Sequence, residues 1–73
     1  AFGETVANYQ GIRWMIADMA IQIEAARQLT YAAAAAVDAG KTGPEMASLA
    51  ASAKCFASDV AMKVATDAVQ IFG

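Results

Sequence analysis

The chain contains few of the residues that build metal sites or covalent staples. Histidine is absent from its 73 residues, and Cys55 is the single cysteine. One cysteine cannot form an internal disulfide, and the ligand set of a structural zinc site is lacking. Domains below roughly 80 residues usually need such a staple or a partner, because their own core is thin. The sequence therefore predicts that part of the core comes from another chain or from further sequence.

Positive charge and long apolar runs are also scarce. The chain has 5 Lys and Arg against 7 Asp and Glu, and the cations are scattered. Without a basic stripe, nucleic acid is not an expected partner. Uncharged stretches reach about ten residues, short of the ~18 of a transmembrane helix, and no polar face has the Lys/Arg excess of a membrane-surface helix. We expect no membrane and no secretory signal, and the lone thiol fits a reducing compartment.

The one proline lies next to the clearest break in the pattern. Gly40 is a natural left-handed helix stop, and Pro44 suits the first turn of a new helix. Thr42 or Gly43 can be the N-cap, and Thr42 with Glu45 has the spacing of a capping box. We expect a helix over about residues 5–39, a turn over 40–44 and a second helix over about 44–71. The expected fold class is all-α: an antiparallel two-helix hairpin.

The first helix carries apolar residues on more than one face. A stripe at spacings of three and four predicts the packed side; its members are Tyr9, Ile12, Ile16, Met19, Ile23, Ala26, Thr30, Ala33 and Val37. Trp14, Met15 and Ile21 fall outside that stripe, and a second buried face would explain Trp14. A hairpin cannot bury several faces of one helix, so we expect half of an up-and-down four-helix bundle, completed by self-association or by missing sequence.

The second helix shows two stripes and a charged side. We expect the larger stripe in the core: Leu49, Ala53, Phe56, Val60 and Val64. The smaller stripe would allow close approach of another helix: Ala57, Ala61, Ala65, Ala68 and Phe72. Asp59, Lys63 and Asp67 lie four apart, which predicts a solvated face opposite the core.

Several single residues have a simpler explanation than chemistry. Cys55 is expected to be a small buried hydrophobe, since no base or cation activates it. The four methionines are expected to be core filler. Asp18 among apolar neighbours is expected to be a solvated or hydrogen-bonded helix residue rather than an acid–base group. Glu24 and Arg27, three apart, are expected to form a weak surface pair.

A series of short motifs in a fixed order resembles the C-terminal helical domain of acyl-CoA dehydrogenases. The motifs are Phe2-Gly3, Tyr9-Gln10, Ala17-Asp18-Met19-Ala20, Glu24-Ala25-Ala26-Arg27, Leu29-Thr30-Tyr31, Ala53-Lys54, Phe56-Ala57 and the run from Ala65 to Gly73. Each motif is weak alone, and their order and spacing carry the likeness over nearly the whole chain. The chain begins with Ala and ends after an apolar run, so we expect a fragment.

The resemblance implies a fold and an activity for a longer protein. The family's C-terminal domain is a four-helix bundle, and residues 1–73 would be its first two helices. The family's enzymes are usually tetramers that use FAD to remove two hydrogens from an acyl-CoA thioester, and they pass electrons to an electron-transfer flavoprotein. The implied compartment is the bacterial cytoplasm or the mitochondrial matrix. The family's catalytic Glu has no counterpart in this stretch, so the piece alone should be inactive, with no catalytic residue and no metal.

The resemblance also implies cofactor-contacting positions. These are Phe2, Gln10, Gln70, Phe72 and Gly73. A Gln side chain offers a donor and an acceptor to the adenosine and pyrophosphate portion of FAD, and a Gly lets backbone approach it. Without the resemblance, the glutamines would be surface residues and the phenylalanines packing residues. A second function therefore stays open, a stand-alone helical interaction module that self-associates without catalysis.

Overall fold

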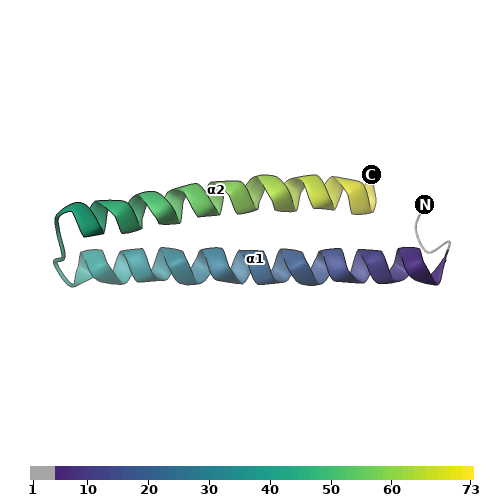
Figure 1. Ribbon diagram of the computed structural model, residues 1–73, viewed down its shortest axis with the longest axis horizontal. Helices are drawn as coiled ribbons and strands as arrows, with labels where there is room; N and C mark the ends of the chain where they lie inside the picture. The colour runs from purple at the N-terminus through teal and green to yellow at the C-terminus, as the bar shows by residue number, and fades with distance from the viewer. Residues whose placement is uncertain (1–4) are drawn as a thin grey trace.

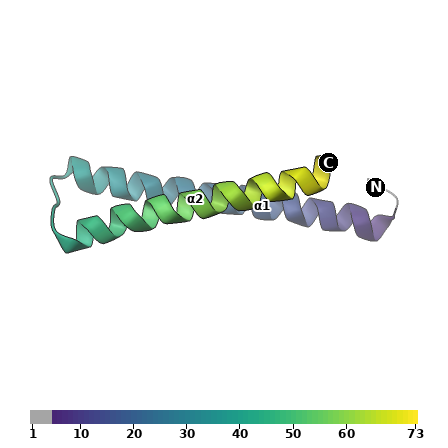
Figure 2. The ribbon, with the colours of Figure 1, turned by 90° about the horizontal axis from the view of Figure 1, so that it is seen from above.

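The computed structural model describes residues 5–73 and contains two long helices (Figure 1). Helix α1 spans Val6–Asp38 and helix α2 spans Pro44–Phe72. They run antiparallel, so that the start of α1 and the end of α2 lie at the same end of a rod 54 Å long and about 15 Å across. Seen from above, α2 crosses over α1 at a shallow inclination (Figure 2). The expected fold class, an all-α two-helix hairpin, is confirmed.

The ends of both helices follow from capping and glycine chemistry. The Thr5 hydroxyl accepts a hydrogen bond from the Asn8 N–H at 3.0 Å, which caps the start of α1. Gly40 has φ +76°, the left-handed conformation that stops α1. Gly43 has φ +97° and ψ −172° and is the N-cap of α2, with no side-chain cap. Of the two N-cap residues left open by the sequence, Gly43 is thus the correct one, and the spacing of Thr42 and Glu45 does not give a capping box, because a backbone conformation open mainly to glycine begins α2 instead.

The packed face of α1 is rotated from the expected stripe. The half-buried residues of α1 are Ile12, Met15, Asp18, Met19, Gln22, Ala26, Leu29, Ala33 and Ala36. We call these residues the α1 seam. Apart from Asp18 they recur at spacings of three and four residues, as in a coiled coil. The expected stripe is correct at Ile12, Met19, Ala26 and Ala33. It is wrong at Tyr9, Ile16, Ile23, Thr30 and Val37, which are exposed. Met15, expected outside the stripe, faces α2 instead.

The packed face of α2 is close to the expected one. Ala53, Val60 and Ile71 are buried, and the rest of the large stripe, Leu49, Phe56 and Val64, is half-buried. The small stripe is mixed, since Ala57 and Ala68 are half-buried while Ala61, Ala65 and Phe72 are exposed. Asp67 does not belong to a solvated face, because its side chain is only 13% exposed beside α1. The expectation of a solvated position is thus wrong for Asp67, whereas Asp59 and Lys63 are exposed.

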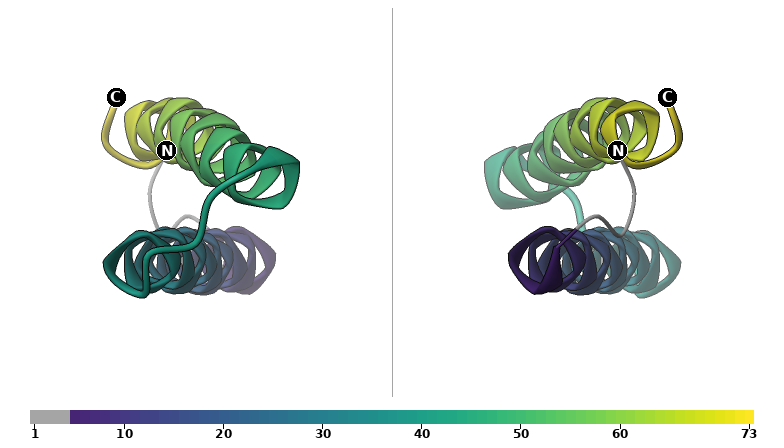
Figure 3. Two further views of the ribbon diagram at one scale, coloured as in Figure 1. Left: turned by 90° about the vertical axis from the view of Figure 1, so that its left-hand side faces the viewer. Right: turned by 90° about the vertical axis from the view of Figure 1, so that its right-hand side faces the viewer.

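Much apolar surface remains uncovered, because each helix has one neighbour (Figure 3). Trp14 is 74% exposed and Ile21 is 65% exposed, on one flank of the α1 seam. Ile16 and Ile23 are exposed on the other flank. Cys55 is exposed and Met62 is 72% exposed, so the expectations of burial for these two residues are wrong within the hairpin. Isolated proteins seldom leave such apolar lines open to water.

Candidate functional site

The end of the hairpin where α1 begins and α2 stops holds most of the residues expected at a cofactor (Figure 1). Gln10 lies in the second turn of α1, and Gln70 lies in the last turn of α2; both are exposed. Between Gln70 and Phe72, Ile71 is 6% exposed and anchors the end of α2 on α1. This anchor leaves the Gln70 amide and the Phe72 ring, which is 80% exposed, free to contact another molecule.

This end combines amides with uncovered apolar groups. Tyr9 is 52% exposed and Val69 is 68% exposed, adjacent in sequence to Gln10 and Gln70 respectively. Cofactor sites typically present apolar walls with a few hydrogen-bonding groups that fix orientation. An amide donates two hydrogen bonds and accepts others, which suits both ring nitrogens and hydroxyls. Among residues 5–73, this end therefore offers exposed amide and apolar groups side by side with the Tyr9 phenol.

The C-terminus of α2 shapes what can be bound there. Gly73 is the C-cap, and its N–H donates to the Val69 carbonyl at 2.6 Å. A Cβ at this position would lie 2.5 Å from that carbonyl oxygen, so the local backbone itself favours glycine. No basic residue lies in the last turn, and a helix C-terminus repels anions. A pyrophosphate at this end would therefore need the glutamine side chains rather than the helix dipole.

A charged cluster joins the middles of the two helices. The Lys63 Nζ donates to Asp18 Oδ2 at 2.9 Å and to Asp67 Oδ2 at 2.7 Å. These hydrogen bonds, the one to Asp67 first, raise the pKa of Lys63 above its ordinary 10.5. The expectation that Asp18 is a hydrogen-bonded helix residue is confirmed. Both carboxylates are paired with Lys63, and through Asp18 the cluster connects the two helices.

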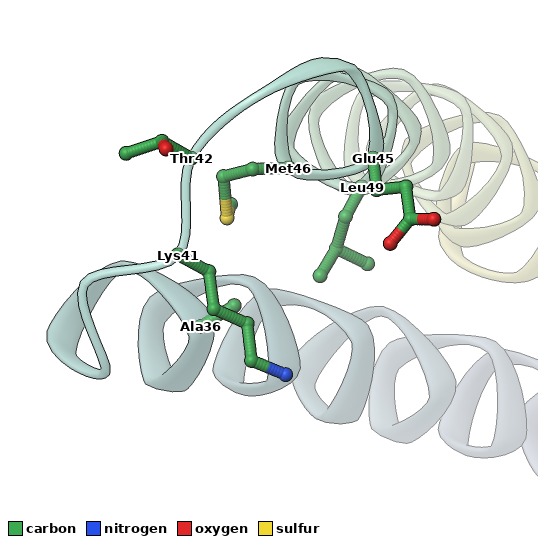
Figure 4. Close-up of a pocket in the computed structure, with 6 residues that line it drawn as sticks. All are labelled: Ala36, Lys41, Thr42, Glu45, Met46 and Leu49. Carbon is green, nitrogen blue, oxygen red and sulfur yellow. The ribbon is translucent and has the colours of Figure 1, made fainter.

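A recess at the opposite end, beside the turn, was not foreseen from the sequence (Figure 4). It has a volume of about 350 Å³ and is lined by Ala36, Lys41, Thr42, Glu45, Met46 and Leu49. Figure 4 shows Met46 and Leu49 reaching from α2 toward α1. The small Ala36 opposite them leaves the space open. Only the pairing of a large side chain with an alanine across the helices could have signalled it.

The remaining expected residues are placed as follows. Phe2 lies outside the described residues. Glu24 and Arg27 form the expected surface pair, with Nε and Oε2 3.5 Å apart. Within residues 5–73 no group of three or more His, Cys, Asp and Glu side chains could hold a metal ion. Neither α1 nor α2 offers a stretch long and apolar enough to cross a membrane.

Comparison with known proteins places the chain in a family. All 73 residues match the family model described as "Acyl-CoA dehydrogenase, C-terminal domain". The probable acyl-CoA dehydrogenase fadE25 of Mycobacterium leprae (strain TN) is 53% identical over 72 residues, which cover 99% of this chain and 18% of that relative. The cyclohexane-1-carbonyl-CoA dehydrogenase of Geobacter metallireducens is 50% identical, covering 99% of this chain and 18% of that relative.

A relative with a different reaction in its name is about as similar. The 3-sulfinopropanoyl-CoA desulfinase of Cupriavidus necator is 50% identical over 72 residues, with 99% of this chain and 17% of the relative covered. No solved structure matches the chain. The chain thus spans less than a fifth of the length of these relatives. Because the family model covers every residue, the resemblance drawn from the motifs is confirmed, and the chain belongs to the acyl-CoA dehydrogenase family, by its C-terminal domain.

Proposed function

We propose that this chain is the first helical pair of the C-terminal bundle of an FAD-dependent acyl-CoA dehydrogenase, where it supplies packing surface and part of the flavin site. The observation that carries the proposal is the match of all 73 residues to the family's C-terminal domain. The exposed apolar side chains of α1 support it, since Trp14 and Ile21 would be buried if further helices packed on them. Catalysis would come from residues outside this chain.

The whole enzyme would act on an acyl-CoA thioester and transfer electrons through FAD to an electron-transfer flavoprotein, in the bacterial cytoplasm or the mitochondrial matrix. FAD supplies the hydride-accepting chemistry when bound. The residues of this chain would hold and orient it: Gln10 and Gln70 by amide hydrogen bonds, Phe2 and Phe72 by apolar contact, and Gly73 by close backbone approach.

The stand-alone interaction module is the weaker alternative. The matched relatives named above are CoA-thioester enzymes, and 72 residues of this chain align with one part of each. Their names nevertheless include both dehydrogenases and a desulfinase. Membership in the family therefore supports a role in the bundle and the cofactor site more strongly than it supports one reaction.

A graft into a relative tests the proposal with the flavin as readout. Residues 1–73 would replace the matching 72 residues of the Geobacter metallireducens cyclohexane-1-carbonyl-CoA dehydrogenase. We expect a folded, yellow enzyme with FAD bound. In that graft, Gln10→Ala and Gln70→Ala should each weaken FAD binding roughly five-fold, the effect of losing one hydrogen bond of about 1 kcal/mol.

The control for the graft is Gln28→Ala, which removes an exposed glutamine of α1 far from the Gln10 end. Its FAD affinity should equal that of the unmodified graft. A folded graft in which the Gln10 and Gln70 variants behave like the Gln28 variant would contradict the flavin role. A graft that does not assemble would contradict the placement in the bundle.

A further inference from the structure

The α1 seam contains polar side chains where more apolar ones were available. Asp18 and Gln22 are half-buried against α2, while Ile16 and Ile23 remain exposed on the neighbouring face. Burial of an isoleucine side chain is favourable, and burial of a carboxylate is costly unless it is paired. Because the observed face also holds Met15, Met19 and Leu29, apolar packing alone does not decide between it and the Ile16 and Ile23 face. Some other interaction must favour the observed face.

The Asp18–Lys63–Asp67 cluster forms only when the observed face of α1 packs against α2, and not when the Ile16 and Ile23 face does. Within residues 5–73 it is the one ion pair recorded between α1 and α2, at 2.9 Å, and Asp67 on α2 holds the same Nζ at 2.7 Å. Distances of this length are typical of charge-assisted hydrogen bonds. Turning α1 toward its Ile16 and Ile23 flank would carry Asp18 away from Lys63 and break the contact.

The residues along the Asp18 line make this selection specific. At seven-residue spacing, Gly11, Ala25 and Ala32 share that line of α1, and none of them carries a charge. The Lys63 side chain thus has one carboxylate partner on this flank of α1. In coiled coils, single polar residues at a seam similarly fix register at some cost in stability.

We propose that the Asp18–Lys63–Asp67 cluster is an orientation device that selects which apolar face of α1 packs against α2. Lys63 and Asp18 act as positioning residues. By holding Met15, Met19 and Leu29 inward, the cluster keeps two flanks of α1 outward at once, Trp14 with Ile21 and Ile16 with Ile23. The inference needs neither the flavin nor any catalytic role, so it goes beyond the proposed function.

Paired distance measurements test the orientation directly. A spin label on the exposed Cys55 is combined with one on Thr30→Cys or on Ala25→Cys, exposed positions on the two flanks of the α1 seam. Labelled 73-residue chain is diluted into excess unlabelled chain lacking Cys55, so that only distances within one chain are seen. A rotation of α1 shortens one distance and lengthens the other, whereas separation or unfolding changes both in the same direction.

Charge reversal and its rescue decide the outcome. Asp18→Lys should shorten the Thr30 distance and lengthen the Ala25 distance, and the exchange Asp18→Lys with Lys63→Asp should restore both. Asp38→Lys, the same change of charge at the exposed end of α1, should leave both unchanged. Asp18→Asn, which keeps the shape, should give the same opposite shifts at smaller amplitude, so the test survives if Asp18→Lys unfolds. Unchanged distances in Asp18→Asn, or a folded exchange variant that fails to restore the wild-type distances, would overturn the proposal.

Discussion

The two helices of this hairpin differ in how much of their apolar surface they hide. Helix α2 has three buried residues, Ala53, Val60 and Ile71, all directed at α1. Helix α1 has no buried residue along Val6–Asp38, although it carries most of the large exposed apolar side chains recorded for residues 5–73. One neighbour thus suits α2 and is insufficient for α1. In the proposed bundle, α1 would therefore have more helical neighbours than α2.

The composition of the helices explains this asymmetry. Alanine buries little area, and α1 has the run Ala32–Ala36 near the turn, so that stretch fits a single close neighbour. The segment of α1 before this run carries Trp14, Ile16, Ile21 and Ile23 around its circumference. Large side chains on several sides of a helix require several helices around it. The segment of α1 that carries these exposed side chains is also the one nearest the expected cofactor residues.

The largest expected effect comes from charging the buried face of α2. Val60→Asp places a carboxylate where the side chain is 6% exposed, and it should abolish the hairpin, with a loss of more than about 4 kcal/mol. Ser58→Asp adds the same charge at an exposed position and should change the free energy of unfolding by less than about 0.5 kcal/mol. Urea unfolding followed by helical circular dichroism measures both. Equal effects would mean that α2 has no distinct buried face.

A smaller effect is expected from removing the charge that joins the helices. Hydrogen bonds to Asp67 and Asp18 raise the pKa of Lys63 above 10.5, so the folded chain favours the cation. The stabilisation that charged Lys63 gives the folded hairpin is therefore fully present below pH 10.5 and is lost as the pH rises through the raised pKa. Between pH about 9 and about 12, the Tm of the wild type should fall more than that of Lys63→Met.

The control for the alkaline experiment is Lys54→Met, because Lys54 is exposed on the same helix. Alkaline effects that do not involve Lys63 are common to all three chains and cancel in the comparison. Lys54→Met should follow the wild type. If Lys63→Met follows it as well, the ion cluster does not stabilise the hairpin.

Much of the fold could be read from local chemistry. Gly40 and Pro44 mark the turn because one permits a left-handed conformation and the other cannot continue a helix. The α2 seam was predictable because large and small residues segregate on that helix. The α1 seam was not, because three neighbouring lines of that helix are almost equally apolar. Its choice depends on the contact between Asp18 and Lys63, residues 45 positions apart, which periodicity within one helix does not reveal.

The candidate site was only partly accessible to the same reasoning. Gln10 and Gln70 entered through the family resemblance, since exposed helical glutamines carry no signal of their own. The structure adds that Gln10, Gln70 and the exposed Phe72 lie toward the same end of the rod.

Sedimentation of the 73-residue chain at micromolar concentration tests most directly whether α1 needs more neighbours than α2 provides. We expect a dimer or larger assembly, and Trp14→Lys with Ile21→Lys should shift it toward monomer. Gln28→Lys with Ala35→Lys adds the same charges further along the same line of α1 and should leave the assembly intact. A stably folded wild-type monomer, with Trp14 and Ile21 open to water, would contradict the account.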